Sequence, residues 1–112
     1  FKENCPDTRN SKVADIIKRL NEYGIEPLVV DPKADKEDAK REYNVDLIEL
    51  EDVNDADCLV FAVAHDEFRN LSLDKIDSLF GDFDNCEKVV IDVKSILDKS
   101  EIEKKGYSYW RL

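Results

Sequence analysis

The run DCLVFAVAH, residues 57–65, constrains the fold more than any other stretch of this sequence. Its apolar side chains occupy successive positions and do not alternate with polar ones, which is typical of a parallel strand buried on both faces. A second run of this kind, EKVVIDVK at 87–94, follows a helical pattern. Because parallel strands need a long crossover between them, usually a helix, these runs predict an α/β fold.

The rest of the chain fits this alternation. A helix is predicted at 11–23, where Asn10 and Ser11 can cap its start and Gly24 can end it. Further helices are predicted at 33–45 and 72–80, strands at 25–31, 45–50 and 107–112, and a helical or irregular segment at 95–106. We therefore expect a Rossmann-like three-layer sandwich with a mainly parallel sheet, built as one domain from residues 1–112.

One strand is missing from this pattern. The helix at 11–23 has no strand before it, although a parallel crossover joins a strand on each side. We expect the first strand to be truncated at Phe1, so that this chain is a piece of a longer protein.

Charge narrows the range of partners. The net charge is −10, which argues against a nucleic-acid partner or an anionic membrane surface. No apolar run reaches the length that spans a bilayer. The opening twelve residues are the exception to the acidity, because Lys2, Arg9 and Lys12 outnumber Glu3 and Asp7 there.

Cysteine and histidine content argues against a metal site. The three cysteines include no CxxC spacing, and there is one histidine, His65. This composition favours a reducing cytoplasm over a disulfide scaffold. We expect Cys58 and Trp110 to be packing residues and His65 to form local hydrogen bonds at a strand end.

The opening stretch FKENCPDTRNSKV resembles the signature that begins the C-terminal, UDP-binding domain of the UDP-glucose/GDP-mannose dehydrogenase family. The positions that match this signature are Phe1, Lys2, Asp7, Arg9 and Ser11. The resemblance continues through VVDPKAD, ADCLVFAVAHDEF, VVIDVKSIL and YSYWRL in the family's order. Within the family, the ENCPDTRNSK variant is similar to the branch that acts on UDP-N-acetylhexosamines for capsule and O-antigen.

The resemblance implies an NAD-dependent UDP-sugar 6-dehydrogenase that oxidises the C6 alcohol of a UDP-hexose or UDP-N-acetylhexosamine to a uronate. By the family's pattern, Lys2 and Lys94 contact the UDP-sugar and Arg9 contacts the NAD pyrophosphate. No catalytic residue is expected here, since the family's cysteine nucleophile belongs to a central domain and Cys5 reads as a loop residue. The resemblance further implies an N-terminal dinucleotide domain, a homo-oligomeric enzyme, and no activity for this chain alone.

A second interpretation comes from another class of protein. A receiver-like signalling domain is also a small acidic α/β sheet, with aspartates at strand ends and a lysine late in the chain, here Asp31, Asp92 and Lys94. Such a domain would bind Mg²⁺ through paired acids near the end of its first strand, where this chain has cations instead.

Asp31 could also mimic the acidic residue that holds a ribose in dinucleotide folds. No GxGxxG precedes it, so a role in a turn is favoured.

Overall fold

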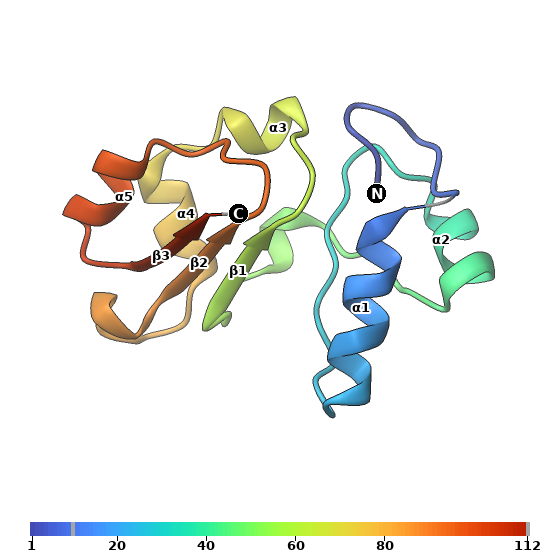
Figure 1. Cartoon of the computed structure of the whole chain (residues 1–112), viewed down its shortest axis with the longest axis horizontal. Helices are drawn as coiled ribbons and strands as arrows, with labels where there is room; N and C mark the ends of the chain where they lie inside the picture. The colour runs from blue at the N-terminus through green and yellow to red at the C-terminus, as the bar shows by residue number, and fades with distance from the viewer. Residues whose placement is uncertain (10, 112) are drawn as a thin grey trace. The chain divides into compact units, whose positions relative to one another are not determined.

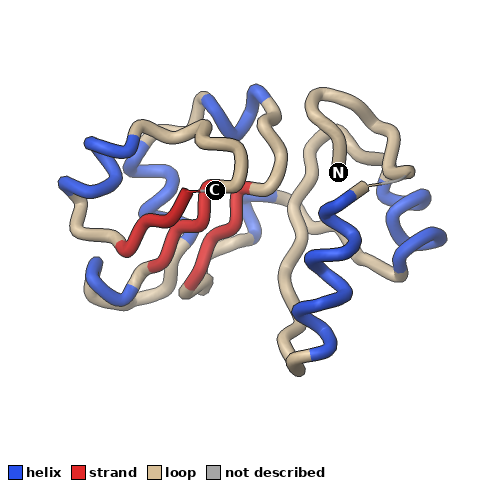
Figure 2. Tube along the Cα trace, in the orientation of Figure 1, coloured by secondary structure: helices blue, strands red, loops and turns tan. Residues whose placement is uncertain are grey.

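The computed structural model describes residues 1–9 and 11–111, which form two compact units, Phe1–Asp52 (unit 1) and Val53–Leu112 (unit 2). Each unit is taken by itself below. Unit 1 holds two helices, and unit 2 holds a three-stranded parallel sheet with three helices (Figures 1 and 2). This architecture confirms the predicted α/β, Rossmann-like class.

The first helix of unit 1, α1 (Lys12–Glu22), begins and ends where the sequence predicts. Ser11 is its N-cap, because the Ser11 Oγ accepts a hydrogen bond from the Val13 N–H at 3.1 Å. Asn10, the other expected capping residue, lies outside the described residues. Gly24 follows the helix with φ +79°, a left-handed conformation that glycine adopts without steric cost.

The second helix, α2 (Lys36–Tyr43), is capped at both ends by side chains suited to the task. Asp35 accepts a hydrogen bond from the Asp38 N–H at 3.0 Å, and Asn44 closes the helix with φ +57°. Together α1 and α2 enclose a small core, which contains Phe1, Ile17, Ala34, Ala39, Val45 and Leu47.

The prediction of strands at 25–31 and 45–50 is wrong. The two segments meet only at a single parallel bridge between Val29 and Leu47, and residues 50–52 form a 3₁₀ turn. Pro27 removes a backbone donor from the middle of the first segment, and Leu28 is 66% exposed. Part of this apolar run therefore faces solvent, and the segment is not a buried strand.

The sheet of unit 2 has the order β1-β2-β3, with β1 at Cys58–Phe61, β2 at Val89–Asp92 and β3 at Ser108–Arg111. The three strands lie side by side in Figure 2 and pair in parallel, with Leu59, Val90 and Tyr109 in one row. The strand predicted as central at 57–65 is shorter than expected and lies at one edge of this three-stranded sheet.

Three helices accompany this sheet, namely α3 (Asp66–Arg69), α4 (Leu73–Leu79) and α5 (Lys99–Lys104). Ser72 caps α4 as predicted, and α5 falls inside the segment expected to be helical or irregular. Ile76 of α4 and Ile102 of α5 are each 1% exposed and join a core cluster with Val90. None of the helices in the described part of the chain has the length and apolar character needed to cross a membrane.

Two residues expected in the core are exposed. Side chains alternate between the two faces of a strand, and the cluster around Val90 uses the face that carries Leu59 and Tyr109. Cys58 and Trp110 point to the opposite face, and Trp110 is 65% exposed. The pKa of the Cys58 thiol is raised, first by partial burial and then by the Asp57 carboxylate, which disfavours the reactive thiolate.

The start of β2 is fixed by a buried cation. Lys88 donates from Nζ to Asp77 at 2.9 Å and to Asn85 at 3.1 Å, and the Tyr107 hydroxyl donates to Asp77 at 2.5 Å. The Tyr107 and Lys88 hydrogen bonds lower the pKa of Asp77, in that order of size. Lys88 is therefore a structural lysine.

We predict that Ile76→Ala lowers the free energy of unfolding by about 2–5 kcal/mol, because it leaves a cavity in the core of unit 2. Ile25→Ala is the matched control, since the Ile25 side chain is half exposed, and should cost less than about 1 kcal/mol. Urea unfolding of the two variants measures both values. Equal losses would contradict the placement of the core.

Candidate functional site

The opening loop (residues 1–9) is held at its first residue. Phe1 is buried, and its ring stacks on Tyr43 of α2 with centroids 5.5 Å apart. The backbone amino group of Phe1 donates to Asp31, and its carbonyl accepts a hydrogen bond from the Ser11 Oγ at 3.0 Å. These contacts fix the loop between α1 and α2.

Thr8 is the second anchor of the opening loop. It is 1% exposed, and its hydroxyl donates to Glu42 at 2.9 Å. The Tyr43 hydroxyl donates to the Thr8 carbonyl at 2.5 Å, and the Asp35 N–H donates to the Pro6 carbonyl at 3.3 Å. Because the buried polar groups of the loop are satisfied from α2, its backbone is fixed and the side chains beside the anchors extend outward.

The two predicted ligand residues of this loop, Lys2 and Arg9, contact the same carboxylate, Asp7. Arg9 donates from Nε and from one terminal nitrogen to the two oxygens of Asp7, both at 3.1 Å, and Lys2 donates from Nζ at 3.3 Å. Arg9 hydrogen bonds, first from the side chain and then from the backbone, hold the pKa of Asp7 well below its usual range. The carboxylate therefore stays ionised even in acid that would protonate an ordinary aspartate.

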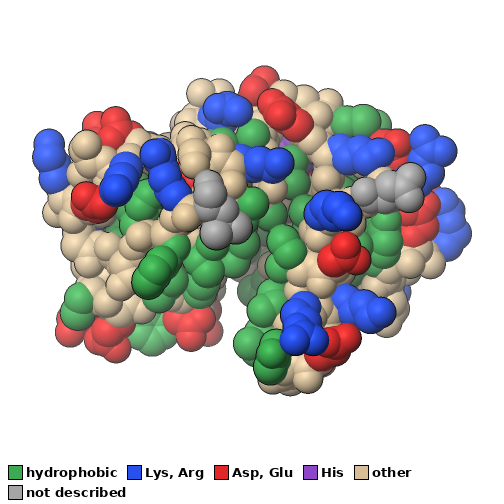
Figure 3. Space-filling view, in the orientation of Figure 1, with side chains coloured by type: hydrophobic (Ala, Val, Ile, Leu, Met, Phe, Trp, Pro, Cys, Tyr) green, Lys and Arg blue, Asp and Glu red, His purple; other side chains and the backbone are tan. Residues whose placement is uncertain are grey.

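Both cations remain accessible despite this pairing. The Arg9 side chain is 75% exposed and the Lys2 side chain 39% exposed. The guanidinium has more N–H donors than the two bonded to Asp7, and an ammonium has more than one. Figure 3 shows that the cationic side chains on the face in view are interspersed with acidic ones and form no broad basic patch. Any anion bound here is recognised by individual donors.

Lys94 lies in unit 2, in the turn that follows β2. This placement at the carboxyl end of a parallel strand matches the prediction, and it is where open α/β sheets bind ligands. Lys94 is exposed, and the structure shows no hydrogen bond or ion pair to its side chain within residues 1–9 and 11–111. In unit 1, Lys2 closes a tight turn with Cys5, whose N–H donates to the Lys2 carbonyl at 3.3 Å.

The turn that carries Lys94 is built around a buried carboxylate. Asp92 has no exposed surface and accepts hydrogen bonds from the backbone N–H groups of Ile96 at 3.0 Å and Leu97 at 2.9 Å. The Tyr109 hydroxyl donates to Asp92 at 2.6 Å. Arg111 donates to the Leu97 carbonyl at 2.9 Å, which fixes the other side of the turn. Sequence reasoning missed this role, although the Asp-Val-Lys run at a strand end was its signal.

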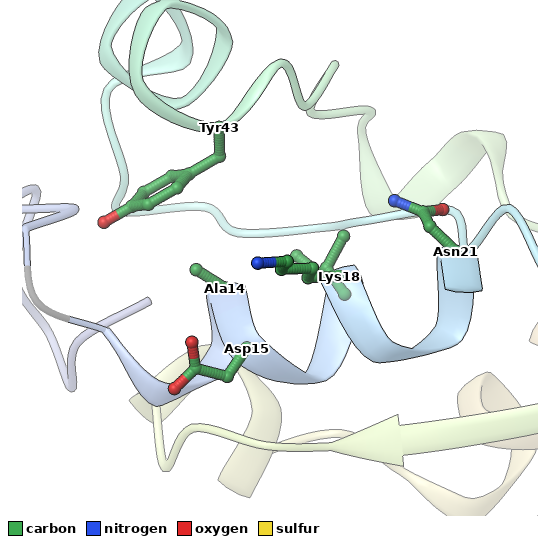
Figure 4. A pocket seen from close by; sticks show the side chains of 6 residues that line it. Ala14, Asp15, Lys18, Asn21 and Tyr43 are labelled. Carbon is green, nitrogen blue, oxygen red and sulfur yellow. The ribbon is translucent and has the colours of Figure 1, made fainter. Parts of the chain in front are cut away.

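The pocket beside α1 contains none of the predicted ligand residues. A shallow, open pocket of unit 1 lies between α1 and Tyr43, and Figure 4 shows Lys18 and Asn21 of α1 around it. Its lining includes none of Lys2, Asp7 or Arg9. The opening loop therefore presents Lys2 and Arg9 on an exposed surface.

The other candidates have structural roles. The Asp31 carboxylate accepts hydrogen bonds from the backbone of Phe1, Lys33 and Ala34, which confirms a turn role. His65 has no exposed surface, and its ring lies 5.4 Å from that of Phe68. No group of three metal-ligating side chains occurs among the described residues, and nothing observed favours a receiver-like domain.

Comparison with known proteins shows the family. Residues 1–99 match the UDP binding domain of the UDP-glucose/GDP-mannose dehydrogenase family. This match covers both units and includes Lys2, Arg9 and Lys94. The chain belongs to the UDP-glucose/GDP-mannose dehydrogenase family, as its opening signature predicts.

The relatives that the chain resembles include dehydrogenases named for UDP-N-acetylhexosamines. The chain is 38% identical over its whole length to protein CapL of Staphylococcus aureus, covering 25% of that protein. It is 41% identical, over 90% of its length, to a UDP-N-acetyl-D-glucosamine 6-dehydrogenase of Pseudomonas aeruginosa, covering 23% of that enzyme. A UDP-N-acetyl-D-mannosamine dehydrogenase of Methanococcus maripaludis strain C7 is 35% identical over 96% of the chain, which covers 23% of it. The chain thus spans about a quarter of the length of these relatives.

We predict that Asp92→Asn destabilises the protein by about 1–3 kcal/mol, because the amide cannot accept all the hydrogen bonds that Asp92 accepts. Amide hydrogen exchange at Ile96 and Leu97 should become faster. Asp82→Asn, an exposed site with the same chemical change, should leave both quantities unaltered. Unchanged exchange in Asp92→Asn would show that the Lys94 turn does not depend on this carboxylate.

Proposed function

We propose that this chain is the UDP-sugar-binding, C-terminal domain of an NAD-dependent nucleotide-sugar 6-dehydrogenase. The enzyme oxidises the C6 alcohol of a UDP-hexose or UDP-N-acetylhexosamine to a uronate for surface polysaccharide synthesis. The observation that carries this proposal is the opening loop, in which Lys2 and Arg9 are displayed from a backbone fixed by α2. Two of the relatives, a UDP-N-acetyl-D-glucosamine 6-dehydrogenase and a UDP-N-acetyl-D-mannosamine dehydrogenase, support the same substrate class.

The rest of the enzyme lies in other domains. The relatives are about four times as long as this chain, which leaves room for a dinucleotide domain and a central domain. In this proposal the central domain supplies the nucleophile and the contacts that make a homo-oligomer in the cytoplasm. This chain alone would form no NADH, since it provides one wall of the site and no catalytic group.

The roles proposed for the cations are those that the family's pattern implies, and the chemistry of the side chains is compatible with them. Lys2 and Lys94 contact the diphosphate of the UDP-sugar, and each presents an exposed ammonium with donors that remain accessible. Arg9 contacts the pyrophosphate of NAD, which its planar guanidinium fits through the donors not bonded to Asp7. NAD, when bound, supplies the hydride acceptor for the oxidation.

We predict that Lys2→Ala and Arg9→Ala in the full-length protein weaken binding of different ligands. A hydrogen bond to a charged group corresponds to about 10- to 150-fold in affinity. Lys2→Ala should weaken UDP-sugar binding by about that factor and affect NAD much less, and Arg9→Ala should do the reverse. Calorimetric titration of each ligand measures the effects.

Lys12→Ala is the control for loss of a nearby positive charge, because Lys12 is an exposed residue at the start of α1 with no assigned role. It should change either affinity by less than about threefold. If Lys2→Ala and Arg9→Ala also stay within about threefold for both ligands, the two residues are surface cations and the site lies elsewhere.

A further inference from the structure

We propose that Asp7 is a positioning residue for anion recognition, which holds Lys2 and Arg9 in the orientations that bind the two diphosphates. This inference rests on the proposed function of those cations. The shared carboxylate at the opening loop is the observation behind it, since neither cation is oriented by any other side-chain hydrogen bond in the described residues.

The contact between Asp7 and Arg9 is specific in geometry. The carboxylate accepts two parallel hydrogen bonds from the guanidinium, and one of its oxygens also accepts the backbone N–H of Arg9 at 2.9 Å. This arrangement fixes the plane of the guanidinium relative to its own backbone. A lysine lacks such a fork, and accordingly Lys2 makes a single, longer contact of 3.3 Å.

The backbone beneath this contact is also held. Thr8, between Asp7 and Arg9, is buried and bonded to Glu42 and Tyr43 of α2. Asp7 is therefore not a mobile surface acid that happens to meet a cation. An Arg9 side chain that is three-quarters exposed would otherwise sample many rotamers, and ordering them on binding would weaken affinity.

An opposite role for Asp7 makes the opposite prediction. If Asp7 only neutralised the two cations, it would compete with the incoming anion, and removing its charge would strengthen binding. The positioning role predicts weaker binding even though the local charge becomes more positive. The sign of the change in affinity therefore separates the two roles.

The test is calorimetric titration of the full-length protein with UDP and, separately, with NAD. Asp7→Asn retains an oxygen for the Arg9 N–H but loses the charge and the fork. We expect it to weaken binding of NAD, and to a lesser degree of UDP, by about three- to tenfold. Glu3→Gln is the matched control, because it removes an equal charge from an exposed position of the same loop. It should leave both affinities unchanged or slightly stronger.

A further variant guards against a general loss of structure. Asp7→Glu keeps the carboxylate and should regain most of the affinity lost in Asp7→Asn, whereas a purely steric role predicts that Glu is at least as impaired. Unchanged or tighter NAD binding by Asp7→Asn, or no recovery in Asp7→Glu, overturns the positioning role alone. Failure of the unmutated protein to bind either UDP or NAD overturns the proposed function as well.

Discussion

The loops that carry the candidate ligand residues depend on buried carboxylates. Burying a carboxylate is costly unless hydrogen-bond donors surround it, and a short loop provides such donors in its own backbone N–H groups. In unit 1, Asp31 accepts from the backbone of Phe1 and from two residues of its own turn. In unit 2, Asp92 accepts from two backbone N–H groups and from Tyr109. Each carboxylate thereby fixes the backbone beside a lysine, Lys2 in unit 1 and Lys94 in unit 2.

The charged residues that stabilise the structure are different from those that a ligand can reach. Lys88, Asp31 and Asp92 are buried and bonded within their own units, so a ligand cannot reach them. Lys2 and Arg9 are exposed on a fixed backbone. Preorganised cations of this kind bind a diphosphate with a smaller loss of conformational entropy than cations on a mobile loop. An acidic chain can therefore bind anions through a few placed donors, without a net positive surface.

Local signals were enough to predict α1, α2, α4 and the strands of unit 2, whereas the short helix α3 was not predicted. Ser11 marks the start of α1 and Gly24 marks its end, because helix capping and left-handed turns depend on the local residue types. The prediction of strands around Val29 and Leu47 is wrong, since an apolar run of a few residues does not reveal which side chains face solvent. Cys58 and Trp110 were misplaced for the related reason that the buried face of a sheet depends on its helices.

The candidate site was likewise predictable from the sequence only in part. The resemblance to the family predicted Lys2, Arg9 and Lys94 as ligand residues, and their roles stay predictions. The bonding of Asp7 to both opening cations, and of Asp92 to its turn, depends on backbone geometry and could not be read from spacing alone. Thr8 and Tyr43 illustrate the same limit, because their contact joins residues far apart in sequence.

The most direct measurement is a crystal structure of the full-length protein with a UDP-sugar and NAD bound. If the opening loop recognises diphosphates, a phosphate oxygen of the UDP-sugar lies about 3 Å from Lys2 Nζ, and the NAD pyrophosphate lies at a similar distance from the Arg9 guanidinium. The bidentate contact between Arg9 and Asp7 is retained in that complex. Both ligands bound elsewhere, with Lys2 and Arg9 still in contact with Asp7 alone, would contradict the assignment of this loop.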